Sequence, residues 1–473
     1  MNAPLTDAGK AADEKALARF GYAQQLLRSM GGFQNFALSF SIISILTGAV
    51  TLYGHGLRFG GPLVMSVGWP VVAIFTMFVA LSLAELASAF PTAGALYHWS
   101  SLLGGAGLGF FTAWLNTLGQ FAITAAIDYG LAEFLAPLLG LAADRSNVLL
   151  LFAALLLSHG VLNHLGVKAV ALLNVVSAWY HLAGVAVLVG CLAWLAPMQP
   201  IAFLLTPYTN QAFPLHYAFL IALLQPAWTF TGYDASAHAT EETKDPSRNA
   251  PKGIILSVAV SAVAGWLMLA VVTLAIPDLA TTANAANPFL YVLDKSMGAV
   301  GSALAWMVIG AMWFCGLASV TSNSRMLFAF ARDGGLPFST QLAKVSARFS
   351  SPHIAVWTSV VMALLIAVWA DAYSVMAALS TVALYLSYAL PIGAGLLAKR
   401  SGKWKEKGPF DLGRWSTFVN SVALLWVAAM TVLMSLPPNA LAGYTLLGTF
   451  VVLGVVWVLF MRKWFKGPKI TPL

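Results

Sequence analysis

Charged side chains are scarce in this sequence. Only 9% of its 473 residues are Asp, Glu, Lys or Arg, whereas 59% are hydrophobic. Soluble proteins carry about 25% charged residues, so this composition excludes an ordinary soluble domain. It predicts an all-α polytopic membrane protein. At about 20 apolar residues per membrane span, a chain of this length holds roughly 10 to 14 spans.

Cysteine is also rare, and the motifs of several enzyme classes are absent. The two cysteines, Cys191 and Cys315, both lie in apolar runs, which argues against a disulfide framework. The sequence has no HExxH, no phosphate loop, no Rossmann glycine pattern and no GxSxG. We therefore expect a protein that is not an enzyme and that holds no metal and no cofactor.

The order of apolar and polar runs predicts twelve membrane-spanning segments. They lie at residues 33–57, 64–90, 107–138, 147–166, 168–195, 213–239, 253–276, 300–331, 353–370, 373–398, 416–436 and 441–461. The polar first 30 residues contain no apolar core with a cleavage site. We therefore expect no removable signal peptide and a cytoplasmic N-terminus. Twelve spans then return the C-terminus to the cytoplasm.

The distribution of basic residues agrees with this topology. Of the 25 Lys and Arg residues, Arg58, Arg145 and Lys295 alone fall in predicted outside loops, as the positive-inside rule requires. The densest basic runs are residues 399–407 and the C-terminal tail. We expect these runs to contact anionic lipid of the cell membrane rather than nucleic acid.

Two of the predicted spans are interrupted at corresponding points. Thr47-Gly48 lies within the first segment and Thr231-Gly232 within the sixth. A repeat of five helices must be inverted in the membrane, and paired interrupted spans indicate a transport site near the bilayer midplane. The alternative is that these glycines are ordinary helix-packing positions.

Several stretches of the chain resemble the amino acid–polyamine–organocation superfamily of transporters, and most closely its amino acid/choline transporter branch. They are "ARFGYAQQLLRSMGGFQNFALSFS", "GLRFGGP", "SLAELASAFPTAGALYHW", "FTGYD" with "EETKDPSRNAPKGI", "SNSRMLFAFARDGGLP" and "STVALYLSYALPIG". The resemblance implies 12 transmembrane helices in a five-plus-five inverted repeat (LeuT-like). In that arrangement helices 1 and 6 are unwound and two accessory helices follow.

The resemblance also implies a division of the chain. Residues 1–31 would be a cytoplasmic segment. The transport core would span 32–398, with repeats at about 32–195 and 213–398. A basic loop at 399–415, accessory helices at 416–461 and a cytoplasmic tail at 462–473 would follow.

The same resemblance implies a permease that imports an amino acid or a related small amine, such as GABA or choline, by alternating access. A polyamine or organic-cation transporter, a substrate exchanger and a transporter-like ligand sensor remain alternatives. The oligomeric state is left open.

The interrupted spans supply groups suited to the two ends of an amino acid. An unwound helix frees backbone groups that the bilayer cannot satisfy, and a half-helix N-terminus attracts an anion. We therefore expect the backbone of Thr47, Gly48 and Ala49 to hold a carboxylate. Gly232 opens the second break, where the carbonyls of Phe230 and Thr231 suit an ammonium group.

Two side chains beside the second break are further substrate-binding candidates. Trp228 precedes the break by about one turn and can attract an ammonium through its ring face, although it can equally be a packing residue. Asp234 follows the break, and an acid at membrane depth indicates function. Asp234 can pair with a substrate amine, belong to an inner gate or cap the restarted helix.

One polar stripe marks the third predicted span. Asn116, Gln120, Thr124 and Asp128 recur at every fourth position, which places them on one face of a helix. We expect this face to line a solvated pathway, with Gln120 near the substrate and Asp128 in a gate. The alternative is hydrogen bonding between helices.

His181 lies where, by the resemblance, some proton-coupled relatives carry a lysine that replaces a sodium ion. Histidine titrates near physiological pH. We expect protonated His181 to hold helix 1 against helix 8 near Ser319, which makes a proton the expected co-substrate. Histidine departs from the lysine of those relatives, and the alternative is that His181 is a packing residue.

The remaining gate candidates are charged residues toward the cytoplasmic side. Glu241 and Arg248 fall in the predicted inside loop, and Glu85 lies near the inner end of the second span. We expect Glu85, together with Arg325 and Arg332, to serve as gate or structural pairing. Structural pairing within the loop is likewise the alternative for Glu241 and Arg248.

Overall fold

The structure is a computed structural model that describes residues 17–18, 23, 25–370 and 373–468. Most of the predicted N-terminal segment, and the last five residues of the predicted tail, therefore lie outside the described residues. Within the described part the chain is helical and contains no β-strand. Ten of its helices are long and apolar enough to cross a membrane, and the chain is a multi-pass membrane protein.

The first half of the chain begins with an interrupted helix. Its elements are α2 (Gly32–Ile43), α3 (Gly48–Thr51), α4 (Tyr53–Gly60), η1 (Val64–Gly68), α5 (Trp69–Ala89), α6 (Leu96–Gly104), α7 (Ala106–Leu138), α8 (Arg145–His164), α9 (Val167–Leu195) and η2 (Ile201–Leu205). The π-helix η1 runs directly into α5, so the second span is continuous from Val64 to Ala89.

The middle of the chain begins with a second interrupted helix. Its elements are α10 (Leu215–Ala222), α11 (Leu224–Thr229), α12 (Ala235–His238), η3 (Thr240–Glu242), α13 (Pro246–Leu274), α14 (Leu279–Asn284), α15 (Pro288–Met297), α16 (Ala299–Arg332), α17 (Ser339–Leu342), α18 (His353–Trp369) and α19 (Tyr373–Arg400). The C-terminal part comprises η4 (Gly413–Trp415), α20 (Ser416–Met434), α21 (Ala440–Val456), η5 (Trp457–Met461) and α22 (Arg462–Trp464).

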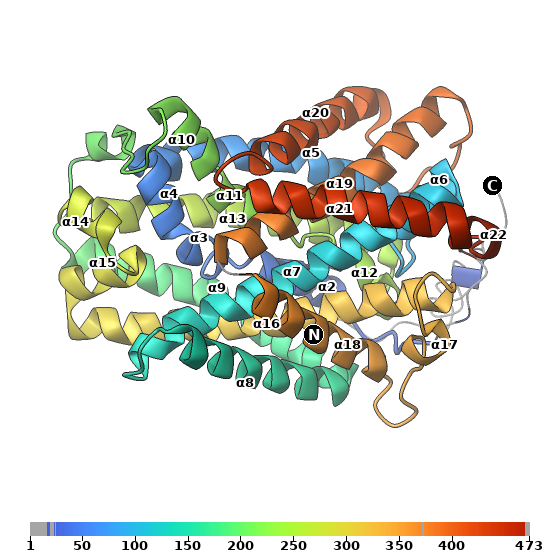
Figure 1. Ribbon diagram of the computed structural model, residues 1–473, viewed down its shortest axis with the longest axis horizontal. Helices are drawn as coiled ribbons and strands as arrows, with labels where there is room; N and C mark the ends of the chain where they lie inside the picture. The colour runs from blue at the N-terminus through green and yellow to red at the C-terminus, as the bar shows by residue number, and fades with distance from the viewer. Residues whose placement is uncertain (1–16, 19–22, 24, 371–372, 469–473) are drawn as a thin grey trace.

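The long helices run roughly along the longest axis of the molecule (Figure 1). Helices α4, α10, α14 and α15 lie at one end, and α6, α17 and α22 lie at the other (Figure 1). Helix α7 packs along both α19 and α16, and α13 packs against α2 and α5. The interrupted segments therefore lie among long helices that hold them in place.

Burial separates the central helices from the peripheral ones. Within its most apolar stretch, α7 is 72% buried, whereas the span that contains α21 is only 11% buried. Apolar side chains exposed over a whole helix are expected where the solvent is lipid. Helix α21 thus lies at the outside of the bundle and α7 at its centre.

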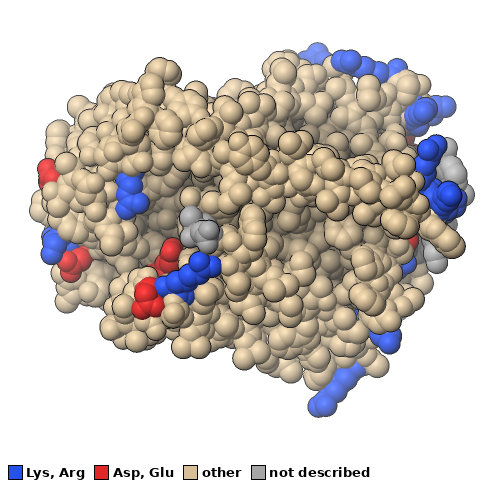
Figure 2. Space-filling model, viewed as in Figure 1, with Lys and Arg blue, Asp and Glu red and all other residues tan. Residues whose placement is uncertain are grey.

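Charges leave the middle of the visible face bare. Figure 2 shows Lys and Arg gathered at the end that carries α22, fewer charges at the opposite end, and a broad uncharged band across much of the molecule. An apolar belt between two polar ends is the surface that a bilayer requires.

Candidate functional site

The two helix interruptions lie against each other. Helix α2 ends at Ile43, and its C-cap Ser44 has a φ of 30° before α3 starts at Gly48. Helix α11 ends at Thr229 and α12 starts at Ala235, with Gly232 at a φ of 88° between them. A Cβ at Gly48 would lie 2.9 Å from Thr229 Cα, so glycine permits the close approach of the two backbones.

A small cavity lies where the breaks meet. It is bordered by both interrupted helices and by α7 and α16, and its volume is about 10 Å³. Its lining residues are Ile42, Ile43, Thr47, Gly48, Ile123, Ile127, Trp228, Thr229 and Cys315. This volume corresponds to about one water molecule, so an amino acid could bind here only if the surrounding elements moved apart.

A larger vestibule of about 790 Å³ reaches the same region from the end that carries α4 and α15. Thr51, Arg58, Glu133 and Tyr373 are among its lining residues. The Tyr373 hydroxyl donates to Thr51 Oγ1 at 2.8 Å. The Tyr373 ring packs edge-on against Trp228, with 5.8 Å between centroids.

Trp228 and Tyr373 thus lie between the vestibule and the small cavity. The Trp228 indole N–H also donates to Ser380 Oγ on α19 at 2.9 Å. Both aromatic side chains are therefore fixed by hydrogen bonds to other helices. Tyr373 was not among the residues that the sequence suggested.

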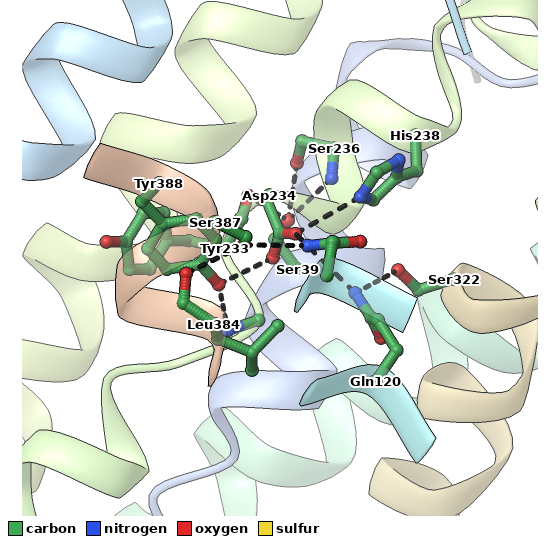
Figure 3. A network of polar contacts seen from close by, with 12 residues as sticks. Ser39, Gln120, Tyr233, Asp234, Ser236, His238, Ser322, Leu384, Ser387 and Tyr388 are labelled. Carbon is green, nitrogen blue, oxygen red and sulfur yellow. Dashed lines mark hydrogen bonds and ion pairs between the residues drawn. The ribbon is translucent and has the colours of Figure 1, made fainter. Parts of the chain in front are cut away.

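Asp234 lies on the other side of the second break and accepts four side-chain hydrogen bonds (Figure 3). Tyr388 Oη donates to Oδ1 at 2.9 Å, and Asn116 Nδ2 donates to Oδ2 at 3.2 Å. His238 Nε2 lies 3.1 Å from Oδ2, and Gln120 Nε2 lies 3.5 Å from the same atom. These donors satisfy both oxygens of the buried carboxylate.

The network around Asp234 joins three helices. Asn116 and Gln120 come from α7, Tyr388 from α19 and His238 from α12. Asp234 is fully buried and is not among the residues that line the small cavity. The sequence contained a signal for His238, which follows Asp234 by four residues and so shares its helix face. Tyr388 is distant in sequence and gave no such signal.

The end opposite the vestibule is closed by buried ion pairs. Arg325 Nε donates to Glu242 Oε1 at 2.9 Å, with both side chains almost completely buried. Arg332 holds Glu241 through two hydrogen bonds of 2.8 and 3.0 Å. Both arginines lie on α16 and both acids on η3, so α16 is clamped to the segment that follows the second break.

Backbone contacts add to this closure. The Met30 N–H donates to the Glu242 carbonyl at 2.8 Å, and the Lys244 N–H donates to the Met30 carbonyl at 2.9 Å. The chain just before α2 is thereby tied to the chain just after η3. Arg248, in contrast, has a side chain that is 65% exposed and lies 4.0 Å from Asp245.

The backbone groups at the two breaks differ in how far they are satisfied. The Thr47 and Gly48 N–H groups both donate to the Ser44 carbonyl, at 2.7 and 2.9 Å, and the Ala49 carbonyl accepts from Gln225 Nε2 at 2.9 Å. Within the described part of the chain, the carbonyl oxygens of Phe230 and Thr231 accept no hydrogen bond. The second break therefore presents free acceptors, whereas two N–H donors at the first break are already engaged.

His181 contacts the first break directly. Its Nε2 lies 2.6 Å from Ser44 Oγ, and its Nδ1 lies 2.8 Å from the Ser177 carbonyl. Ser319 instead pairs with Thr124 Oγ1 at 2.7 Å. Among the described residues no hydrogen bond joins His181 to Ser319.

Asp128 and Glu85 have partners that the sequence did not identify. Asp128 Oδ2 lies 3.1 Å from His159 Nδ1 on α8, and both side chains are fully buried. Glu85 pairs with Lys399 at 2.6 Å and accepts from Ser416 Oγ at 3.1 Å. Glu85 thus joins α5 to α19 and α20, while Arg325 and Arg332 bind other acids.

Comparisons with known proteins agree with this helical architecture. A family model described as "Amino acid permease" matches residues 30–460. The chain is 38% identical to the "Amino-acid permease BAT1 homolog" of Oryza sativa subsp. japonica, with 98% of each chain covered. It is 35% identical to the "Amino-acid permease BAT1" of Arabidopsis thaliana, with 98% of this chain and 97% of that protein covered. It is 28% identical to a "GABA-specific permease" of Saccharomyces cerevisiae, with 98% and 86% covered.

Proposed function

Because this chain belongs to the amino acid permease family, we propose that it imports an amino acid or a related small amine by proton-coupled alternating access. The observation that carries this proposal is the meeting of two interrupted helices at one small cavity, with a vestibule on one side and buried ion pairs on the other. Such a site needs one movement to open it to each side in turn. Members of this family are transporters rather than enzymes.

The proposed architecture has twelve spans. Ten are the long apolar helices, and the others are the shorter helix His353–Trp369 and the interrupted segment 215–238. In this arrangement residues 32–195 and 213–398 form the five-plus-five inverted repeat of the transport core. The loop 399–415 leads to the accessory helices at 416–461, and residues 1–31 and 462–473 are the cytoplasmic ends.

The proposed orientation places the vestibule outside the cell. The end opposite the vestibule carries the buried ion pairs and most of the Lys and Arg residues visible in Figure 2. The positive-inside rule assigns that end to the cytoplasm. The cell membrane is then the proposed location, and its anionic lipids are the partners of the basic loop and tail.

The proposed substrate lies between the two breaks. Its ammonium group binds the free carbonyls of Phe230 and Thr231, under the ring of Trp228, where a cation gains from the aromatic face. Its carboxylate takes the Thr47, Gly48 and Ala49 N–H groups, so Thr47 and Gly48 must release the Ser44 carbonyl when substrate binds. A zwitterion satisfies both breaks, whereas a simple cation such as choline or a polyamine satisfies only one.

Asp234 acts in this proposal through its neighbours. Its carboxylate accepts from four donors and thereby fixes Gln120 and the second half of the broken helix. Gly232, two residues earlier, provides the positive φ that the break requires. Gln120 then forms the floor of the substrate site, on the side away from the vestibule.

In the proposed alternating access, an outer barrier and an inner barrier open in turn. On the outside the barrier is Trp228 with Tyr373, which are two side chains in edge contact. On the inside it is the clamp of Glu241 and Glu242 on α16, with Glu85 joining neighbouring helices. Arg248 lies at the rim of this inner barrier, where its exposed charge contributes little.

A proton is the proposed co-substrate, and His181, which touches the first break, is one candidate for the coupling residue. Protonation of its ring changes which atom of the His181–Ser44 pair can donate. Ser319 transmits movement between α7 and α16 through Thr124. His181→Gln is expected to flatten the pH dependence of uptake, and an unchanged pH profile would remove His181 from this role.

The native cysteines provide a test of the binding site. Cys315 lines the small cavity, whereas Cys191 lies elsewhere on α9 and is replaced by serine in the test protein. Purified protein is first screened by thermal unfolding with amino acids, GABA, choline and spermidine, because a ligand that binds the folded state raises its apparent stability. We expect a zwitterion among them to stabilise the protein and to slow alkylation of Cys315. A stabilising ligand that leaves the alkylation rate unchanged would place the binding site elsewhere.

A further inference from the structure

A second pair of titratable side chains lies beside the substrate cavity. Asp128 on α7 and His159 on α8 are both fully buried, and His159 Nδ1 lies 3.1 Å from Asp128 Oδ2. The remaining polar atom of each side chain, Asp128 Oδ1 and His159 Nε2, has no hydrogen-bond partner. Each unpartnered atom has a lone pair that can accept one proton while the bond between Nδ1 and Oδ2 stays in place.

Asp128 and Asp234 differ in the number of hydrogen bonds that each accepts, and this difference gives the two acids different chemistry. Asp234 accepts four hydrogen bonds from four different side chains. Asp128 has one donor, and no Lys or Arg of the described residues forms an ion pair with it. A buried carboxylate with one donor is costly as an anion and is relieved by one added proton.

We infer that the Asp128–His159 pair is a proton-binding site that loads one proton for each transport cycle; this rests on the proposed function. In the loaded pair one extra proton resides on Asp128 Oδ1 or His159 Nε2, and the pair is neutral overall. Release gives that proton to water and leaves the pair with one negative charge. The neutral pair tolerates burial, whereas the charged pair requires solvent, so release accompanies opening of the site.

The position of the pair couples it to the substrate. Ile127 and Cys315 line the cavity, and they are the chain neighbours of Asp128 and Gly316. A Cβ at Gly316 would lie 2.6 Å from His159 Cε1, so α16 packs directly on the pair. A movement of α7 against α16 that widens the cavity must therefore also change the surroundings of the pair.

A polar seam extends from the pair along α7 and α16. Thr124 pairs with Ser319, and Gln120 Nε2 donates to Ser322 Oγ at 3.5 Å. In the other direction Glu133, which lines the vestibule, is five residues from Asp128 along α7. That spacing corresponds to about 7.5 Å of helix, which places the pair within a short distance of the vestibule.

Other titratable groups lie near the Asp128–His159 pair, but they make the pair no less suitable as the proton-binding site of this region. Helix α16 contributes Cys315, α9 contributes His181, and α18 begins with His353, which lies beside His164 at the end of α8. Tyr129 and Glu133 follow on α7, and Tyr373 of α19 lines the vestibule together with Glu133. Neither His181 nor His164 has a carboxylate among its hydrogen-bond partners.

The test separates exchange of substrate from accumulation driven by protons. Proteoliposomes are loaded with ¹⁴C-labelled GABA, alanine, glutamate or arginine for exchange. For accumulation, the proteoliposomes are given a gradient of one pH unit, acidic outside and at zero membrane potential. One proton per substrate supports at most about tenfold accumulation at that gradient. The variants are Asp128→Asn and His159→Gln, which keep the size of each side chain and remove its titration.

Both variants are expected to exchange substrate at a rate within about threefold of wild type. Neither is expected to accumulate it, so the ratio of internal to external substrate should stay at about one. His164→Gln is the matched control on the same helix. His164 accepts from Trp357 Nε1 at 3.2 Å, and its variant is expected to keep both activities. His181→Gln reports separately on the other coupling candidate.

Wild-type accumulation in both variants would overturn the inference and leave the proposed function intact. Loss of exchange and accumulation together in both variants would also overturn it, because that pattern assigns the pair a structural role. If wild type exchanges none of the four labelled compounds, the proposed function fails first, and the inference that depends on it fails as well.

Discussion

Replacing Glu242 by glutamine should open the inner barrier. Glu242 and Arg325 are 0% and 1% exposed, and they meet at 2.9 Å. Removing one partner of a buried pair costs about 3–5 kcal/mol, because the other charge is left uncompensated. That cost applies only while the barrier is closed, since opening hydrates Arg325. A shift of about 3 kcal/mol multiplies the open-to-closed ratio by roughly 150.

Cys315 reports this change. In a Cys191→Ser background, a membrane-impermeant thiol reagent reaches Cys315 from the cytoplasmic side of inverted vesicles only when the inner barrier opens. Glu242→Gln should raise the alkylation rate by at least about tenfold, a lower bound that allows for partial relaxation around Arg325. Replacing both partners, as Glu242→Gln with Arg325→Met, should restore much of the protection.

Arg248→Gln is the matched control for the charge change. Arg248 is 65% exposed and lies 4.0 Å from its acid, so its removal should change the rate less than about threefold. An alkylation rate in Glu242→Gln within twofold of the parent protein would refute the assignment of this pair to the inner barrier.

Three further substitutions test other parts of the structure. Gly232→Ala should reduce uptake by at least about tenfold, because Gly232 has a φ of 88° and alanine there costs about 1–2 kcal/mol before any steric clash. Trp228→Phe should weaken substrate binding about three- to tenfold, measured by thermal titration, because it loses the bond to Ser380. Glu85→Gln should lower the unfolding temperature and leave substrate affinity unchanged, because its 2.6 Å pair with Lys399 lies away from the cavity.

Matched controls exist for the first two. A Cβ at Gly190 meets no atom within 4 Å, so Gly190→Ala should keep full uptake. Trp194 is 88% exposed, and Trp194→Phe should keep the substrate affinity of wild type. Equal uptake by Gly232→Ala and Gly190→Ala would contradict the role of Gly232 in the break. Equal substrate affinity in Trp228→Phe and Trp194→Phe would contradict the role of Trp228 in binding. For Glu85→Gln, a loss of affinity without a loss of stability would do so.

Features encoded locally could be predicted from the sequence. The two Thr-Gly pairs mark where the helices are interrupted, because glycine supplies the backbone freedom at the second break and the close approach at the first. The fourfold spacing of Asn116, Gln120, Thr124 and Asp128 predicts one polar face. All four residues contact polar groups on other helices or on Asp234, which directly precedes α12.

Pairings between distant segments could not be predicted in the same way. Composition marks Glu241, Glu242, Arg325 and Arg332 as charged residues near one membrane face, but the rotation of α16 about its axis decides which acid meets which arginine. For the same reason Tyr373 and Tyr388, both on α19, entered the site only through tertiary packing. His159 was missed because its partner Asp128 lies on a different helix, 31 residues earlier.

The central claim is that this chain moves an amino acid across the membrane at the expense of a proton gradient. The most direct measurement is uptake of the labelled ligand found in the stability screen, by wild-type proteoliposomes, with and without a gradient of one pH unit. We predict accumulation above the equilibrium level that disappears when the gradient is dissipated. Saturable binding to the purified protein without any accumulation would contradict the claim and would indicate a ligand sensor.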